Sequence, residues 1–383
     1  MTEENHQAAG RTTPMAGPLR GPGAGFGADV GPGPTTGKKA PRPSGGYWHN
    51  VWRRFRRNRR GLVGLTFVAI LLTVAFFSPL LASGQPIVCK YQGKWYFPAV
   101  VELFQSRRVG DHWINKSPPF NLPQFDAKAA AEEFEFALWP LIPYHEFEQT
   151  LDYYEPPSRQ HWLGTDELGR DVAARLIHGT TVSIKVGFIS MAIASLIGIV
   201  LGGLAGYFAG WVDIVISRFI EVVICFPVFF LILSIMIWLE PSITNVMIVI
   251  GFTGWTSIAR YTRGEFMRIK SVDYVTAAKA LGVGNARIMF RHMLPNALSP
   301  VLVTITFGIA SAILVESALS WLGFGVQPPA PSWGNMLRTA YDSLRIAPHL
   351  VYPPCVAIFL AVLAYNLVGD ALRDAIDPYL TKK

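Results

Sequence analysis

Charged residues are absent from long apolar runs of the chain and concentrate in the polar segments between them. Seven runs of 18 or more residues carry no Asp, Glu, Lys or Arg. Run 317–337 is rich in proline and glycine, so its backbone N–H and C=O groups could not all form hydrogen bonds in lipid. We therefore place it outside the bilayer. The other six can each cross a hydrocarbon core of about 30 Å as a helix. The pattern predicts an all-α integral membrane protein with six transmembrane helices, at about 61–83, 186–209, 216–239, 242–260, 298–317 and 351–369.

Composition and charge agree with this class. The chain is 51% hydrophobic and 16% charged, with a mean hydropathy of +0.30. Arginines crowd the juxtamembrane segment 47–60, and by the positive-inside rule this end stays in the cytoplasm, followed by an uncleaved span. The basic residues of 263–296 and the C-terminal Lys382 and Lys383 fall on the same side. A basic cluster that abuts an apolar span is a topology anchor in contact with membrane lipid, so no nucleic-acid partner is expected.

Two segments lie outside the pattern of spans. Residues 1–46 contain 11 Gly and 7 Pro and few large apolar residues, which predicts a disordered cytoplasmic tail. Residues 84–183 form an external region between the first and second spans. Its string YQGKWYFP, at 91–98, predicts a strand or hairpin whose aromatic side chains pack locally. A partner-binding aromatic face is the alternative interpretation.

The last part of this external region, 161–181, predicts an interfacial helix that leads into the second span. Thr165 or Asp166 is a suitable N-cap for such a helix. Its apolar positions share one face, and Arg170 and Asp171 would face water or lipid headgroups.

A polar, basic loop follows the fourth span at 263–296. A helical run from Tyr274 to Leu281 meets Gly282, and a second run starts near Asn285 and ends at Pro295. This predicts two short helices joined by a tight glycine turn outside the bilayer. Small side chains at Ala277 and Ala278 would let another surface approach the backbone closely.

A few residues within the spans are candidates for a pathway or gating role. Glu316 is an acid near the outer end of the fifth span, and Pro227 would allow a hinge in the third. Asp166, Arg170 and Asp171 are further candidates at the outer mouth. The glycines of the second span, Gly198, Gly202, Gly203 and Gly206, predict tight packing against a partner permease.

No arrangement of residues for catalysis is found. The chain lacks a phosphate-binding loop, a nucleophile elbow and clustered metal ligands, so we expect no catalytic residue, cofactor or metal. Its histidines, among them His161, are expected to be solvated or to face headgroups. Two other classes remain as alternatives. An ion-coupled secondary transporter would show more spans and repeat symmetry, and a membrane-bound enzyme would need a reactive cluster.

The polar segments resemble those of a known family. Residues 271–296 are similar to the cytoplasmic coupling loop of ABC importer permeases, with Thr276 where that family has Glu. The strings LGTD and GRD within 161–181, ESALSWLGFGVQPPAPSWG at 316–334 and GDALRDAIDP at 369–378 resemble the dipeptide, oligopeptide and nickel permeases. The resemblance covers about 50–81 and 158–380. The external insert is similar to that of the microcin C type permeases.

This resemblance implies the fold of a type I ABC importer permease, with a permease core at 184–380, in a bacterial inner membrane. The implied partners are a second permease, two ABC ATPase subunits that hydrolyse ATP, and an external solute-binding protein. The implied substrate is a peptide or peptide-like solute, with nickel or another small solute as the alternative. Ile288, Met289 and Leu294 would also anchor the loop on the membrane helices. The residues implied in ATPase docking are Thr276, Ala277, Ala278, Gly282, Ile288, Leu294 and Pro295.

Overall fold

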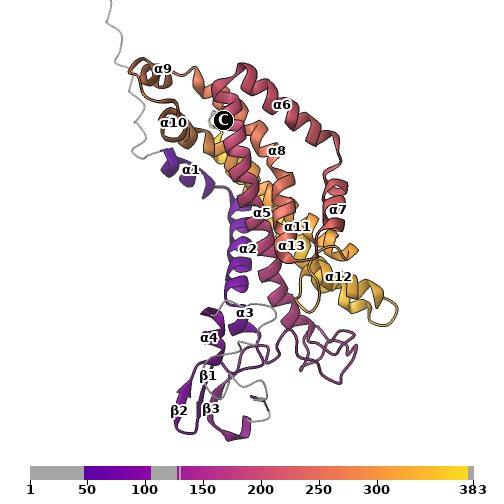
Figure 1. Ribbon diagram of the computed structural model, residues 1–383. Coiled ribbons are helices and arrows are strands. Elements are labelled where there is room, and N and C mark those ends of the chain that lie inside the picture. The colour runs from indigo at the N-terminus through magenta and orange to yellow at the C-terminus, as the bar shows by residue number, and fades with distance from the viewer. Residues whose placement is uncertain (1–46, 105–126, 129–130, 378–383) are drawn as a thin grey trace, which may run out of the picture. The chain divides into compact units, whose positions relative to one another are not determined.

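Figure 1 shows the computed structural model, which describes residues 47–104, 127–128 and 131–377. The prediction for the tail at 1–46 falls outside these residues, as do Lys382 and Lys383.

Four helices of the described residues are long and apolar enough to cross a membrane: α2 (Arg59–Phe76), α5 (Val172–Phe208), the continuous helix Asn285–Leu322 and Pro348–Ile376. The third combines α10 (Asn285–Arg287), a π-helical turn (Ile288–Met293) and α11 (Leu294–Leu322). The fourth combines a 3-10 turn (Pro348–Val351) and α13 (Tyr352–Ile376). The predicted multi-pass helical membrane protein is therefore confirmed, whereas its number of six spans is not.

The predicted third span is broken. α6 (Gly210–Cys225) and α7 (Val228–Trp238) are bent by 83° across Phe226 and Pro227, and count as a fifth span only if taken together. Proline disfavours the helical region for the residue before it, and Phe226 accordingly adopts φ −89° and ψ 132°. Arg263 forms a two-pronged ion pair with Asp213, which ties α6 to the next helix.

The remaining long helix, α8 (Ile243–Lys270), is more polar because Thr253, Thr256 and Arg260 interrupt its apolar sequence. It packs along α5, as Figure 1 shows. A Cβ atom at Gly202 would lie 2.3 Å from the carbonyl oxygen of Ala259, and one at Gly206 would lie 2.6 Å from that of Arg263. The glycine face of α5 therefore packs within this chain, so the prediction that it packs against a partner permease was wrong.

Segment 84–183, which was predicted to be external, contains the only strands of the described residues, and this corrects the prediction of an all-α fold. β1 (Val88–Tyr91) pairs antiparallel with β2 (Lys94–Tyr96) and with β3 (Phe134–Leu138), in the order β2-β1-β3. Gln92 and Gly93 form the hairpin turn with φ of 49° and 74°, values that suit a two-residue loop. The predicted hairpin is thus present, and Cys89 of β1 is buried.

Short helices complete the described chain. α1 (Tyr47–Phe55) precedes α2, and α3 (Ser78–Leu81) and α4 (Pro98–Phe104) flank the first two strands. A 3-10 turn (Ala131–Glu133) leads into β3. α11 extends to Leu322, and α12 (Trp333–Asp342) follows the proline-rich segment, so part of run 317–337 is helical.

Candidate functional site

The polar loop after α8 forms a helical hairpin. α9 (Asp273–Ala280) ends at a left-handed glycine, Gly282, with φ 75°, and α10 begins at Asn285. Gly282 N–H donates to the carbonyl of Lys279, and Val283 N–H donates to that of Ala278. These two bonds make a Schellman motif, in which glycine adopts the left-handed conformation without a Cβ penalty. The sequence prediction of two helices joined by a glycine turn is confirmed.

One face of this hairpin is buried on the ends of α5 and α8. Ile288 and Met293 are fully buried, and Tyr207 Oη of α5 donates to Asn285 Oδ1 at 2.7 Å. The buried cluster consists of Tyr207, Phe266, Ile269, Val275, Ala278, Ile288, Met289, Met293 and Ala297. Because these apolar contacts join the hairpin to α5, α8 and α11, displacement of the hairpin would be transmitted to the long helices.

The outward face differs from the prediction at two positions. Ala278 is 9% exposed and Ile288 is fully buried, because they share the inward face of the hairpin. Neither side chain is available to a docking partner in this conformation, although Ile288 and Met289 do anchor the loop as expected. Leu294 is half-buried. The exposed members of the predicted set are Thr276, Ala277, Gly282 and Pro295.

Two apolar residues of the outward face were missed. Leu281 is 83% exposed at the tip of the hairpin, and Phe290 is 54% exposed in the π-helical turn. Sequence periodicity could not have found Leu281, because its spacing of three residues from Ala278 continues the inward stripe of Val275 and Ala278. Leu281 is exposed because α9 ends before it, at Ala280.

The predicted end of the second helix at Pro295 was wrong. The helix continues through the π-helical turn into α11, and Leu294 N–H donates to Met289 O five residues back. Pro295 occupies the first turn of α11, just after this wider turn. In a regular helix, the ring of a proline clashes with the carbonyl group four residues back. The wider π-helical turn before Pro295 relieves this clash, so the proline is tolerated there.

The polar residues of segment 161–171 that were expected to be solvated are buried, which corrects the predicted interfacial helix. Residues 161–171 form turns, and α5 starts at Val172 with Asp171 as its N-cap, which accepts from Ala174 N–H at 2.7 Å. Asp166 pairs with Arg170 at 2.8 Å, and His161 Nδ1 lies 2.8 Å from Asp171. Burial raises the pKa of the Asp171 carboxyl above its usual value, against the opposing effect of its hydrogen bonds from Ala174 and His161.

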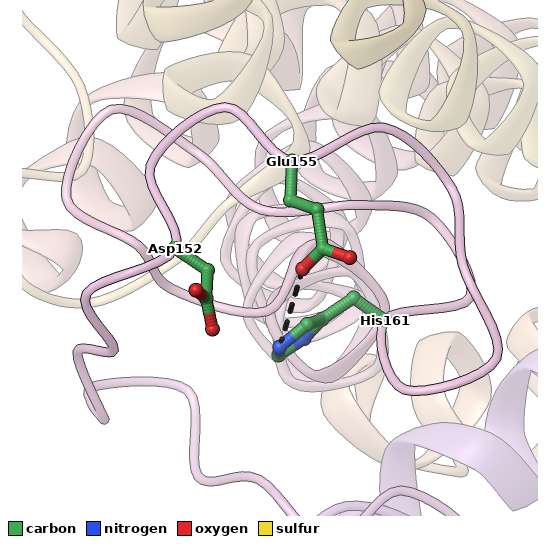
Figure 2. Close-up of side chains that lie close together, drawn as sticks. All are labelled: Asp152, Glu155 and His161. Atoms are coloured by element: carbon green, nitrogen blue, oxygen red, sulfur yellow. Dashed lines mark ion pairs between the residues drawn. The ribbon is translucent and has the colours of Figure 1, made fainter.

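Figure 2 shows three nearby side chains that were not predicted to lie together. Asp152, Glu155 and His161 each direct one ligand atom to within 4.8 Å of the others, a spacing at which a cation could be held. The prediction that the chain lacks clustered metal ligands is corrected to this extent. His161 Nε2 lies 4.0 Å from Glu155, and Asp152 is exposed. The same geometry is also explained without a metal, because a buried imidazole attracts the carboxylate groups around it.

The candidate pathway residues of the spans lie apart from one another. Glu316 is fully buried and accepts hydrogen bonds from Ser320 at 2.7 Å and Ser183 at 3.3 Å. It therefore joins α11 to α5 in this conformation, and its pathway role stays a prediction. Pro227 lies at the break between α6 and α7, where a hinge was expected.

Two family models match the chain. The model of the binding-protein-dependent transport system inner membrane component matches residues 198–382, which include the hairpin. The model of the N-terminal TM domain of oligopeptide transport permease C matches residues 46–93.

Relatives match between 64% and 86% of the chain. The inner membrane ABC transporter permease protein YejE of Escherichia coli is 36% identical, covering 85% of this chain and 96% of that protein. The dipeptide transport system permease protein DppC of Alkalihalophilus pseudofirmus is 31% identical, covering 86% and 90%. The glutathione transport system permease protein GsiD of Pectobacterium atrosepticum is 40% identical, covering 64% and 82%. The chain belongs to the family of binding-protein-dependent transport system inner membrane components and is a permease subunit of an ABC importer.

Proposed function

We propose that this permease subunit forms, with a second permease, the pathway for a peptide or peptide-like solute. Dipeptide and glutathione are named for two of its relatives, and both are peptides. An external solute-binding protein would deliver the solute, in keeping with the binding-protein-dependent family. Nickel or another small solute is the alternative.

The hairpin at α9 and α10 would receive the force of ATP hydrolysis from one of two separate ATPase subunits. The observation that carries this proposal is that the hairpin has one buried face and one exposed face. One side is packed on α5 and α8, while Thr276, Ala277 and Gly282 present small side chains on the other. A surface of small residues lets a partner approach the backbone closely. Docking shifts the permease between conformations only if its affinity differs between them.

The way α5 and α8 pack supports six spans. Gly251 of α8 lies against Ser190 of α5, and Arg263 lies against Gly206, so the two helices run in the same direction. If α5 crosses the membrane, α8 crosses beside it, and the bent pair α6 and α7 returns the chain between them. We therefore propose that α8 also spans the membrane, although its sequence is too polar to identify it as a span by hydropathy.

The packing of α2 against α5 and α13 supports cytoplasmic termini. Thr181, near the start of α5, donates to the carbonyl of Ala75 at the end of α2, so α2 and α5 run in opposite directions. The start of α2 therefore lies on the side where α5 ends and the hairpin packs. Ala371, near the end of α13, lies against Gly61 of α2 on this side. The arginines at 53–60 favour the cytoplasm for it.

Uptake of a labelled peptide tests the proposed substrate class. The chain would be reconstituted in liposomes with its second permease, ATPases and solute-binding protein. We expect peptide uptake that requires ATP and the binding protein and that persists when an ionophore dissipates ion gradients. Uptake of nickel but not of peptides would favour the alternative solute, and uptake that stops with the ionophore while ATP is present would contradict the proposed energy source.

A further inference from the structure

The short helix α1 is amphipathic, and its apolar face is already occupied. Val51 and Phe55 are 6% and 4% exposed and pack against Ala371 and Ala375 of α13. Aromatic residues that flank this buried stripe are exposed. Tyr47, Trp48 and Trp52 are 53%, 48% and 51% exposed, respectively.

The junction of α1 with α2 is fixed by close contacts. A Cβ atom at Gly61 would lie 2.2 Å from Cβ of Ala371, so this glycine allows α2 and α13 to approach. Asn58 caps α2 by accepting from Gly61 N–H at 3.2 Å, and its amide donates to Asp374 at 3.4 Å. The position of α1 relative to the first span is therefore set within the chain itself.

Arginines surround this junction without acidic partners. In the part of the chain that the structure describes, none of them forms an ion pair, and the nearby Asp374 is engaged by Asn58. By contrast, Arg218 and Arg268 on other helices pair with Glu221 and Glu265. The unpaired residues are Arg53, Arg54, Arg56, Arg57, Arg59 and Arg60. Six positive charges so close together repel one another unless an anionic partner compensates them.

We propose that α1 and these arginines form a preorganised binding site for the headgroups of anionic phospholipids, with α1 lying in the membrane interface. A guanidinium group binds phosphate oxygens through two parallel hydrogen bonds. Trp and Tyr are enriched where a protein meets the headgroup region. Both features occur here at the end of an apolar span, α2.

The position of the site favours lipid over an acidic protein or a nucleic acid. α2 begins at Arg59, so the arginines lie where the first span leaves the hydrocarbon core. Lipid phosphates occupy this level on every side of the helix. Trp48 and Trp52 add apolar surface beside the charges, which suits the boundary between headgroups and acyl chains. The inference requires only that α2 spans the membrane, and it does not depend on docking of the hairpin to an ATPase.

Native mass spectrometry of the detergent-purified chain tests this site by titration with phosphatidylglycerol and phosphatidylcholine. We expect the wild type to bind phosphatidylglycerol preferentially, with a preference that weakens as salt is added. Substitution of Gln for Arg53, Arg54, Arg56 and Arg57 together should weaken phosphatidylglycerol binding at least ~10-fold. Each basic residue near an anionic lipid surface contributes to the binding free energy, and the variant loses four of them. Arg59 and Arg60 remain in this variant to preserve its orientation in the membrane.

Two control variants separate this site from general effects of charge or folding. The double variant R218Q/R268Q removes two arginines that are paired elsewhere, and should bind phosphatidylglycerol within about 2-fold of the wild type. The same four arginines replaced by Lys keep the charge and should retain the preference for phosphatidylglycerol, but with weaker binding than the wild type because Lys cannot form the two parallel hydrogen bonds. Equal binding of both lipids by the wild type would overturn the proposal, as would an unchanged preference in the Gln variant. Selective binding of an acidic polypeptide or RNA, with no preference among lipids, would also overturn it.

Discussion

Substitution of Trp for Gly282 should reduce ATP-driven uptake to the level measured without ATP, while the chain still inserts into the membrane. Gly282 has φ 75°, a conformation that strains any residue with a Cβ, and no atom lies within 4 Å of where that Cβ would be. The indole would therefore protrude from the hairpin into the space that the ATPase is proposed to occupy. Membrane insertion depends on the apolar helices, which this substitution does not touch. Uptake in proteoliposomes and the amount of inserted chain would be measured together.

A second variant separates blocked docking from strain in the turn. Asn tolerates the left-handed conformation better than other residues with a side chain and is much smaller than Trp. Gly282→Asn should therefore retain most of the uptake. If Gly282→Trp transported as well as the wild type, or if the Asn variant lost as much uptake as the Trp variant, steric block of an ATPase at the hairpin would be contradicted.

Substitution of Ala for Gly202 should lower the melting temperature of the detergent-purified chain and the yield of folded protein. The added methyl group would lie 2.3 Å from the carbonyl oxygen of Ala259 and 2.9 Å from the Cα of the same residue. Both are backbone atoms, so α5 and α8 would have to separate. Overpacking of this kind costs about 1–3 kcal/mol, and Gly202→Leu should cost more than Gly202→Ala.

The adjacent glycine provides a matched control. A Cβ at Gly203 would lie 3.4 Å from the ring of Phe266, an ordinary contact. Alanine is also a better helix former than glycine, so Gly203→Ala should melt at or above the temperature of the wild type. Equal melting temperatures for Gly202→Ala and Gly203→Ala would show that α5 and α8 do not pack as closely as described.

Sequence patterns were sufficient for the features that depend on local chemistry. Long apolar runs located the helices at α2, α5, α11 and α13. The left-handed turn at Gly282 and the β-hairpin around Gln92 and Gly93 follow from turn residues and the patterns that flank them. The third strand, β3, lies more than 40 residues beyond its partner β1, so no local signal indicated their pairing.

Burial of polar residues could not be predicted in the same way. Asp166 and Arg170 satisfy each other inside the outer turns, and a charged side chain with such a partner looks no different in sequence from a solvated one. The buried carboxylate of Glu316 accepts hydrogen bonds from the hydroxyl groups of Ser183 and Ser320, and Ser183 is 133 residues away in sequence. The predicted exposure of Ala278 failed for another reason. In a helix of eight residues, the side that faces the membrane helices is set by packing against Tyr207 and Phe266, which lie far away in sequence.

Cross-linking from the hairpin tests most directly whether its outward face docks on an ATPase. Ala277 and Ala278 are adjacent small residues of α9, the first exposed and the second buried. In the assembled importer, a photoreactive group attached at Ala277→Cys should cross-link to the ATPase, with a yield that changes when ATP is added. The same group at Ala278→Cys should cross-link far less. Modification of Ala277→Cys only by reagents that act from outside the cell, or an ATPase cross-link from Ala278→Cys alone, would contradict the account.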